Sequence, residues 1–319
     1  MFASVLKPLI KRLPPVARLI AQRDALAAQV AALQDQGQAA GVKFPPGHFH
    51  SPIPDLDQIA ADANRIFAPS PREIAGVDLR EAAQLELFEA LASYYDELPF
   101  PARETKGFRY YYENPFYSYS DGITLYAMLR HFKPRRIVEI GSGFSSGLML
   151  DCNERLFENA IELTFVDPYP VNLRKILRPA DAPRVTVLEQ RVQDLLPSLF
   201  APLQANDILF IDSTHVSKID SDVNRLFFEI LPALDPGVLV HIHDIFYPFE
   251  YPRAWIEEGR AWNELYLLRA FLQYNTAFEI LYFNTYLEHF HEALFAERMP
   301  LCLKNKGGSV WLRRGDKRA

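Results

Sequence analysis

The sequence contains only two cysteines, Cys152 and Cys302, among its 319 residues. Two cysteines cannot build the disulfide framework of a small secreted domain, and such low usage is typical of a reducing compartment. No apolar run approaches the roughly 20 residues that span a bilayer, and the charges and prolines near the N-terminus disfavour a secretory signal. We therefore expect a cytoplasmic protein with no integral membrane segment.

An overall basic charge is also missing, because the formal net charge is −6. Nucleic-acid binding requires lysine and arginine to neutralise phosphates, so this charge argues against a nucleic-acid partner. Residues 1–23 are an exception, since they carry basic residues and no acid: Lys7, Lys11, Arg12, Arg18 and Arg23. This segment suits an anionic membrane surface or partner, but we favour a solvated helix face.

The chain is rich enough in apolar residues, at 49%, to bury a full core. Its length fits two domains or one large α/β domain with extensions. Within residues 1–40, apolar residues follow heptad spacing at Val16, Leu19, Leu26, Val30 and Leu33. They predict an amphipathic helix or short coiled coil, which either forms a homo-oligomer or packs on its own domain. Residues 41–105 are interpreted as a proline-rich connector with a cap helix, and residues 106–319 as the main domain.

Four apolar runs of the main domain contain or end at an acidic residue, namely Glu139, Asp167, Asp212 and Asp244. These runs alternate with helical segments, which is typical of βαβ units. The pattern predicts an α/β fold with parallel strands near 136–140, 162–167, 184–188, 207–212 and 238–243. In an open parallel sheet a ligand lies outside the carboxyl ends of the strands, where the strand order reverses. We therefore expect the functional site at the edge that carries these acids.

A glycine turn, Gly141-Ser142-Gly143, follows the first of these strands. It fits two classes of nucleotide-binding fold, and alone it is weak support for either. Ser146 stands where the dinucleotide fingerprint needs its third glycine. Glu139 adds a negative charge, which suits a cationic ligand with an amino group better than a pyrophosphate. Both details disfavour a dinucleotide.

The chain resembles class I S-adenosylmethionine-dependent methyltransferases in a set of motifs. They are Val138–Gly143 as the first motif, Asp167 after the second strand, Asn206–Asp212 as the fourth strand, and Leu231–Gly237 before the fifth. The resemblance implies a Rossmann-like, doubly wound, seven-stranded sheet with helices on both faces, in addition to the N-terminal helical extension. The late apolar runs at 278–283 and 309–313 would supply the last two strands, and the last strand would be antiparallel.

The same resemblance implies a bound S-adenosyl-L-methionine held by six residues: Glu139, Gly141, Ser142, Gly143, Asp167 and Asp212. Glu139 would anchor the amino-acid end of this methyl donor. Asp167 would accept both ribose hydroxyls, although it could instead be a turn residue before Pro168. One of residues 190–193 would face the adenine.

The candidate catalytic residues follow the fourth and fifth strands and comprise Asp212, His215, His243 and Asp244. His215 lies in a predicted loop, where it could serve as a general base. Strand alternation places His241 and His243 on one face and Asp244 on the other. We interpret His241 as a core residue.

This part of the sequence is similar to metal-assisted O-methyltransferases and to cephalosporin-hydroxylase-like relatives, which implies a divalent metal. His243 stands where an acid is frequent, and imidazole suits Zn, Fe, Ni or Cu better than Mg²⁺. The site could equally work without a metal, so the ligand set stays open.

We expect an O-methyltransferase that acts on a hydroxyl of a small molecule or a glycan. A metal-dependent oxygenase on the same fold is the alternative enzyme, and an oligomeric, non-catalytic assembly factor is the alternative outside enzymology. Two aromatic runs, 110–119 and 245–255, would form either walls for the acceptor or part of the core.

Overall fold

The structure is a computed structural model that describes residues 14–39 and 43–316. The chain divides into two units, Met1–Ala68 and Pro69–Ala319. Helix α5 (Glu81–Ala92) belongs to the second unit, where it packs against helix α6 (Tyr119–Phe132) and strand β6 (Phe278–Phe283). The predicted cap helix therefore shares a unit with the sheet.

The first unit contains the long helix that the heptad spacing predicts, α2 (Pro14–Ala39), and two short helices, α3 (Leu56–Ala61) and α4 (Ala63–Ile66). Leu19 and Leu26 are exposed on α2, and self-association through this helix stays a prediction. The basic residues before Pro14 lie outside the described residues. Within the described ranges, no helix has the length and apolar character that crossing a bilayer requires.

The second unit is built on one seven-stranded sheet with the order β3-β2-β1-β4-β5-β7-β6. The first five strands are parallel, while β7 runs antiparallel to β5 and β6. This arrangement confirms the predicted Rossmann-like fold. The remaining strand bounds are β1 (Arg136–Ile140), β2 (Glu162–Val166), β3 (Val185–Leu188), β4 (Ile208–Ile211), β5 (Leu239–His243) and β7 (Ser309–Arg314).

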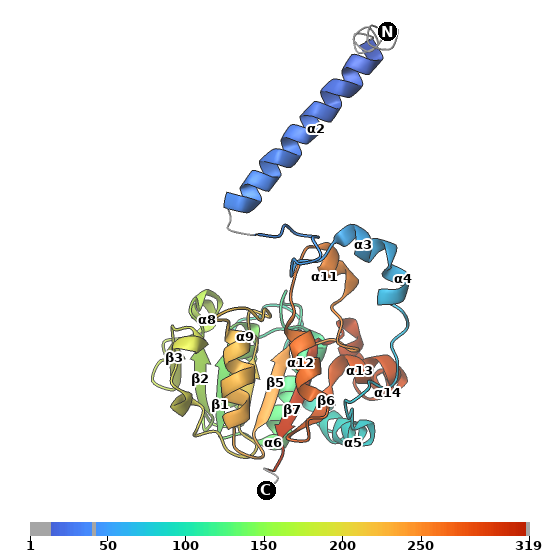
Figure 1. The fold of residues 1–319 in the computed structure, drawn as a ribbon. Coiled ribbons are helices and arrows are strands. Elements are labelled where there is room, and N and C mark those ends of the chain that lie inside the picture. The colour runs from blue at the N-terminus through green and yellow to red at the C-terminus, as the bar shows by residue number, and fades with distance from the viewer. Residues whose placement is uncertain (1–13, 40–42, 317–319) are drawn as a thin grey trace, which may run out of the picture. The chain divides into compact units, whose positions relative to one another are not determined.

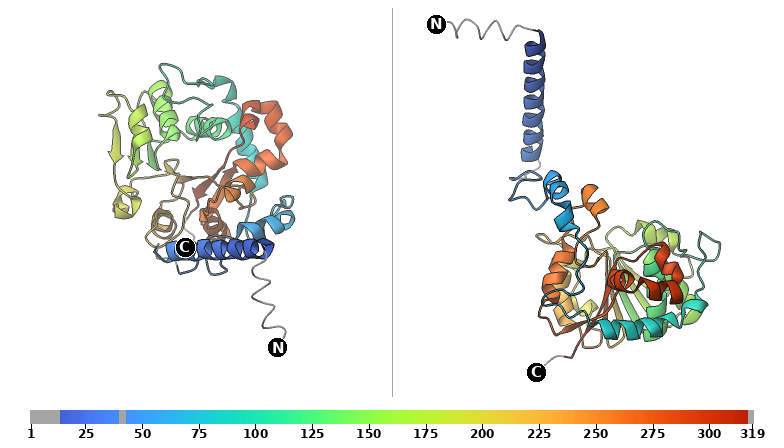
Figure 2. Two further views of the ribbon diagram at one scale, coloured as in Figure 1. Left: turned by 90° about the horizontal axis from the view of Figure 1, so that it is seen from above. Right: turned by 90° about the vertical axis from the view of Figure 1, so that its right-hand side faces the viewer.

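Helices cover both faces of the sheet (Figures 1 and 2). The remaining α-helices are α7 (Phe144–Leu156), α8 (Val171–Ile176), α9 (Asp222–Arg225), α10 (Leu231–Ala233), α11 (Arg253–Glu257), α12 (Glu264–Leu272), α13 (Asn284–Phe290) and α14 (Glu292–Arg298). Short 3₁₀ turns are η1 (Tyr95–Glu97), η2 (Val192–Asp194), η3 (Pro197–Leu199) and η5 (Pro300–Lys304), and η4 (Leu226–Ile230) is a π-helical turn.

The strand order reverses between β1 and β4, and this reversal positions the site. Ile140 at the end of β1 pairs with Val166 of β2 and with Ile211 of β4. The three carboxyl ends are therefore level, and the residues that follow them are Gly141, Asp167 and Asp212.

The centre of the sheet is apolar, and every residue of β4 and β5 is buried. His241 lies in this core with its ring stacked on Phe210 at a centroid distance of 3.9 Å. Burial holds the pKa of His241 well below its usual value, so the ring is neutral. The prediction that His241 is a core residue is confirmed.

Candidate active site

The two glycines of the turn after β1 serve different purposes. Gly141 has a φ of +81°, and a Cβ there would lie 1.9 Å from the backbone oxygen of Asp212. Only glycine fits this close approach of two loops. Gly143 is extended, and a Cβ there would meet nothing within 4 Å. The chain itself requires Gly141, whereas Gly143 borders open space.

Asp167 lies beside this turn with its carboxylate held in place. One oxygen accepts a hydrogen bond from the backbone N–H of Ser142 (3.1 Å), and the other accepts from the N–H of Tyr169 (2.7 Å). The second bond is the turn contact that the alternative interpretation of Asp167 predicts. Asp167 nevertheless faces a cleft of about 390 Å³, which is within the range of ligand sites.

The cleft also contains the segment that follows β3 and the start of the loop after β4. Arg191, Val192 and Gln193 line it on one side, and Asp212 and Ser213 line it on the other. Three of the four residues between 190 and 193 therefore border the cavity in which the resemblance places the adenine.

Glu139 differs from the other strand-end acids because its side chain has no access to solvent. It is fully buried, and its carboxylate accepts hydrogen bonds from the hydroxyls of Ser145 and Ser146 at the start of α7. Burial raises the pKa of Glu139 to about 8, although both serine hydroxyls favour the charged form. The structure thus places Glu139 beneath the glycine turn and outside the lining of the open cleft.

His215 joins the ends of β4 and β5 in one polar cluster. Its Nε2 lies 3.4 Å from a carboxylate oxygen of Asp212 and 3.4 Å from one of Asp244. Its Nδ1 lies 2.8 Å from Oε2 of Glu264, at the start of α12. Since the carboxylate only accepts, Nδ1 carries the proton and donates it to Glu264. Nε2 therefore faces the two aspartates.

His243 lies in the same cluster on the side of α6. Its Nδ1 is 3.1 Å from Asp244, and its Nε2 is 3.8 Å from a carboxylate oxygen of the buried Asp121. The ring of Tyr117 lies 5.2 Å away. Neither nitrogen of His243 makes a well-formed hydrogen bond with any described residue.

Negative charge dominates this cluster, because four carboxylates surround two imidazoles: Asp121, Asp212, Asp244 and Glu264 around His215 and His243. Burial alone would lower both imidazole pKa values, but the neighbouring carboxylates outweigh it. Asp244 and Asp212 raise the pKa of His243 to about 10, while Asp212 and Glu264 raise that of His215 well above its usual value. Burial would raise the pKa of Asp212, but the two imidazoles hold it below its usual value.

Two expectations from the sequence need revision at this edge. Strand alternation does not extend to Asp244, because β5 ends at His243 and Asp244 adopts a left-handed φ of 55°. Its carboxylate therefore contacts His243 and His215 instead of pointing to the opposite face. Sequence reasoning also missed Asp121 and Glu264 as site residues, since both come from helices. The only available signal for Glu264 was an acid in the first turn of a predicted helix.

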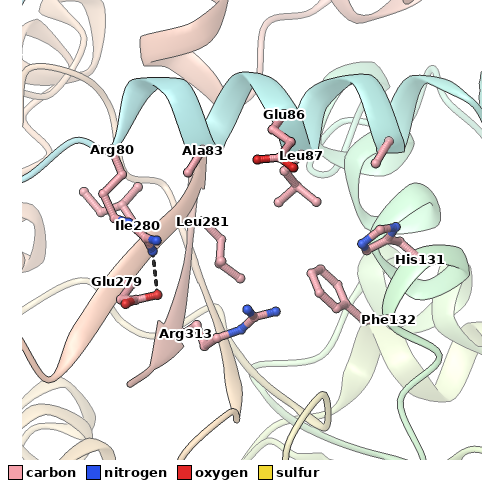
Figure 3. A pocket seen from close by; sticks show the side chains of 11 residues that line it. Arg80, Ala83, Glu86, Leu87, His131, Phe132, Glu279, Ile280, Leu281 and Arg313 are labelled. Atoms are coloured by element: carbon pink, nitrogen blue, oxygen red, sulfur yellow. Dashed lines mark hydrogen bonds and ion pairs between the residues drawn. The ribbon is translucent and has the colours of Figure 1, made fainter. Parts of the chain in front are cut away.

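A second cavity, of about 280 Å³, lies away from these residues (Figure 3). Arg80 donates to Glu279 there, and the guanidinium of Arg313 lies over the ring of Phe132. Arg313 pairs with Leu239 at the start of β5, so this cavity is at the amino end of the strand. None of the predicted site residues lines it.

The doubly wound sheet, the glycine turn and the acids at the switch point define the class I methyltransferase fold. Residues 138–245, from the first motif to just past the end of β5, match a family profile described as a methyltransferase domain. A protein of uncharacterised function from Archaeoglobus fulgidus is 36% identical over 173 residues, which are 53% of this chain and 77% of the archaeal protein.

Solved methyltransferase structures are similar to the chain at low identity. Methyltransferase PaMTH1 of Podospora anserina, bound to S-adenosylhomocysteine, is 15% identical with a TM-score of 0.42, and the match covers 82% of this chain and 95% of that one. The O-methyltransferase TomG of Streptomyces achromogenes, in complex with S-adenosylmethionine, is 17% identical with a TM-score of 0.39, covering 81% and 96%. The chain belongs to the class I S-adenosylmethionine-dependent methyltransferase family and is an enzyme of this class.

Proposed function

We propose that the protein transfers a methyl group from S-adenosylmethionine to a hydroxyl oxygen of a small molecule or glycan. The observation that carries this proposal is the cleft at the strand switch point, where Asp167 and Asp212 flank the glycine turn. A carboxylate-lined cleft suits a donor with a cationic sulfur and an ammonium group. The buried imidazole of His215 directly behind Asp212 supplies a group that can accept a proton.

The residues of the cleft fit the donor. S-adenosylmethionine supplies an activated methyl group on positively charged sulfur. Asp167 would accept hydrogen bonds from the ribose hydroxyls, for which the backbone N–H groups of Ser142 and Tyr169 already orient its carboxylate. Gln193 and its neighbours would border the adenine. Gly141 borders the cleft, and the methionine part would lie beside the turn there.

His215 would act as the general base, and Glu264 would position it. The hydrogen bond from Nδ1 to Glu264 fixes the tautomer that leaves Nε2 as the proton acceptor. The surrounding carboxylates raise the pKa of His215 well above its usual value and so favour the protonated ring in the free protein. Positive charge entering the cluster would lower that pKa and release the proton. Asp212 and Asp244 would then stabilise the imidazolium that reforms during the reaction.

A metal-assisted form of the same reaction is the second candidate. Asp212, His215 and Asp244 each offer one ligand atom, and these three atoms lie within 4.8 Å of one another. A carboxylate that accepts from the distal nitrogen, as Glu264 does, is the usual support of a metal-binding histidine. Such an ion would lower the pKa of an acceptor hydroxyl and so take over part of the work of the base.

Calorimetric titration with S-adenosylhomocysteine tests the donor site. We expect wild-type protein to bind it and Asp167→Ala to lose at least about tenfold in affinity, since a bidentate contact to an anion is worth more than ~1.4 kcal/mol. Asp235→Ala, an exposed aspartate in a turn, is the matched control and should bind normally. Equal affinity in Asp167→Ala and wild type would refute the assigned donor site.

Metal analysis and treatment with a chelator distinguish the metal-assisted reaction from the reaction in which His215 acts as the base. If donor binding is normal but a metal co-purifies with the protein and is lost in Asp244→Asn, the metal-assisted form is supported. If no metal binds and His215→Gln abolishes methyl transfer without weakening donor binding, His215 acts as the base. Methyl transfer that persists in His215→Gln after treatment with chelator would contradict both.

A further inference from the structure

A large cavity borders the glycine turn at Gly143. It has a volume of about 610 Å³ and lies among the segment 104–116, the start of α7 and helix α8. None of the residues assigned above to the base or to the ribose contact lines it. Its size is that of a site for a small organic ligand.

Three of the four aromatic residues that line this cavity contact one another and form one wall: Tyr111, Phe116 and Phe144. The ring of Tyr111 packs edge-on against Phe144 at 5.6 Å, and Phe116 lies 6.2 Å from the same ring. Phe116 is 68% exposed, although most neighbouring rings in the run 110–119 are buried. An exposed phenylalanine at the lip of an aromatic pocket is the feature expected of a surface that stacks on a ligand ring.

The rim of the cavity also carries two basic side chains, Lys175 and Arg178. Lys175 of α8 is exposed and makes no hydrogen bond or ion pair with any described residue, and Arg178 contacts only Glu154 at 3.4 Å through its guanidinium. The guanidinium of Arg109 is held by Asp151, Asp181 and Glu154 and is not available. Glu104 is the one acid in the lining. Lys175 therefore has no bonded partner among the described residues, and the guanidinium of Arg178 keeps further donors beyond its contact with Glu154.

The cavity adjoins the site of methyl transfer at two places. Gly143 lines it while Gly141 lines the donor cleft, so the two cavities flank one turn. Tyr117 follows Phe116 directly in the chain, and its ring contacts His243 of the polar cluster. A molecule stacked on Phe116 would thus lie across the glycine turn from the donor cleft without occupying that cleft.

We infer that this cavity binds the part of the acceptor remote from the reacting hydroxyl, a planar or sugar ring that carries a phosphate or carboxylate group. The ring stacks on Tyr111, Phe116 and Phe144, and the anion pairs with Lys175 and Arg178. This inference rests on the proposed function, because it assigns the substrate class of the same site. Binding energy gained here positions the hydroxyl for the reaction.

Calorimetry on the full chain with phenyl phosphate as the probe tests the inference. Phenyl phosphate should bind at least about tenfold more tightly than inorganic phosphate, because only the former uses the aromatic wall. Lys175→Ala should weaken it about tenfold. Arg174→Ala, which removes the same charge from the same helix outside the cavity, should change it by less than about twofold. Phe116→Ala should remove the preference for phenyl phosphate over phosphate.

Benzoate distinguishes a carboxylate from a phosphate as the recognised anion, and failure of both phenyl phosphate and benzoate to bind would overturn the inference. Equal losses in Lys175→Ala and Arg174→Ala would also overturn it, since they would indicate general charge attraction. The affinity for S-adenosylhomocysteine should stay unchanged in Lys175→Ala. A loss there would show that the cavity holds the donor itself. If wild type binds phenyl phosphate but no S-adenosylhomocysteine, the proposed function fails while the cavity remains a ring-and-anion site.

Discussion

Replacing Glu264 with glutamine should lower the pKa of His215 measurably. The carboxylate of Glu264 is fully buried and accepts hydrogen bonds from Nδ1 of His215 at 2.8 Å and from the hydroxyl of Ser213 at 2.9 Å. Glu264→Gln keeps the shape of the side chain and an oxygen that can accept from Nδ1. It removes the negative charge that stabilises the imidazolium.

The size of the effect follows from the strength of this bond. A hydrogen bond to a charged partner contributes about 1.5–3 kcal/mol, and a pKa change of one corresponds to ~1.36 kcal/mol. The pKa of His215 should therefore fall by about one to two in Glu264→Gln. It should stay above that of an ordinary histidine, because Asp212 continues to favour the charged ring.

The measurement is an NMR titration of protein with isotopically labelled histidine. The chain has eight histidines, and His215→Gln identifies the resonance that belongs to this ring. Glu297→Gln, an exposed glutamate of α14, is the matched control and should leave the titration unchanged. A pKa for His215 near 6.5 in wild type, or no change in Glu264→Gln with the fold intact, would refute the assigned role of Glu264.

Three further predictions concern stability. Gly141→Ala should lower the free energy of unfolding in urea by at least about 2 kcal/mol, because Gly141 has a positive φ and a Cβ would lie 1.9 Å from a backbone oxygen. Gly143→Ala should lower it by less than ~0.5 kcal/mol, and equal losses would contradict the strain assigned to Gly141. Burial raises the pKa of Glu139 from 4.5 to about 8, so the unfolded chain loses this proton at a lower pH than the folded protein does. The contribution of Glu139 to the free energy of unfolding should therefore fall as the pH rises from 4.5 to about 8, and it should stay constant above that range. The free energy of unfolding of Glu139→Gln, measured with urea, should rise relative to that of wild type by up to about 5 kcal/mol across this pH range. A difference that stays constant with pH would contradict the burial of a neutral acid. Arg109→Met should lower the free energy of unfolding by about 3–5 kcal/mol, because two buried aspartates lose their partner. The surface control Arg174→Met should lower it by less than ~1 kcal/mol, and an equally small loss in Arg109→Met would contradict the assigned role of this buried cluster.

Much of the fold could be predicted because its signals are local. The strands predicted at 136–140 and 278–283 match β1 and β6, and the other strands agree within one residue at each end. Parallel strands bring their carboxyl ends to one edge, so Asp167, Asp212 and Asp244 could be grouped from the sequence alone. The same topology explains why His215, in the loop after β4, lies close to the end of β5.

The remaining parts of the site depend on packing that the sequence does not display. Asp121 of α6 and Glu264 of α12 contact the two imidazoles from outside the sheet, and the order of the strands does not predict which helix residues come close to them. Ser145 and Ser146 reach the carboxylate of Glu139 because α7 begins directly after Gly143. The aromatic run 110–119 divides between core and cavity wall, and side-chain type alone does not separate Tyr110 from Tyr111.

A crystal structure of the protein with bound S-adenosylhomocysteine would test most directly whether the acids at the strand switch point hold the methyl donor. The ribose hydroxyls should contact the carboxylate of Asp167, with the sulfur beside the Gly141–Gly143 turn and the adenine against residues 191–193. A ligand bound elsewhere on the sheet, or a cleft filled by the side chains of the protein itself, would contradict this assignment.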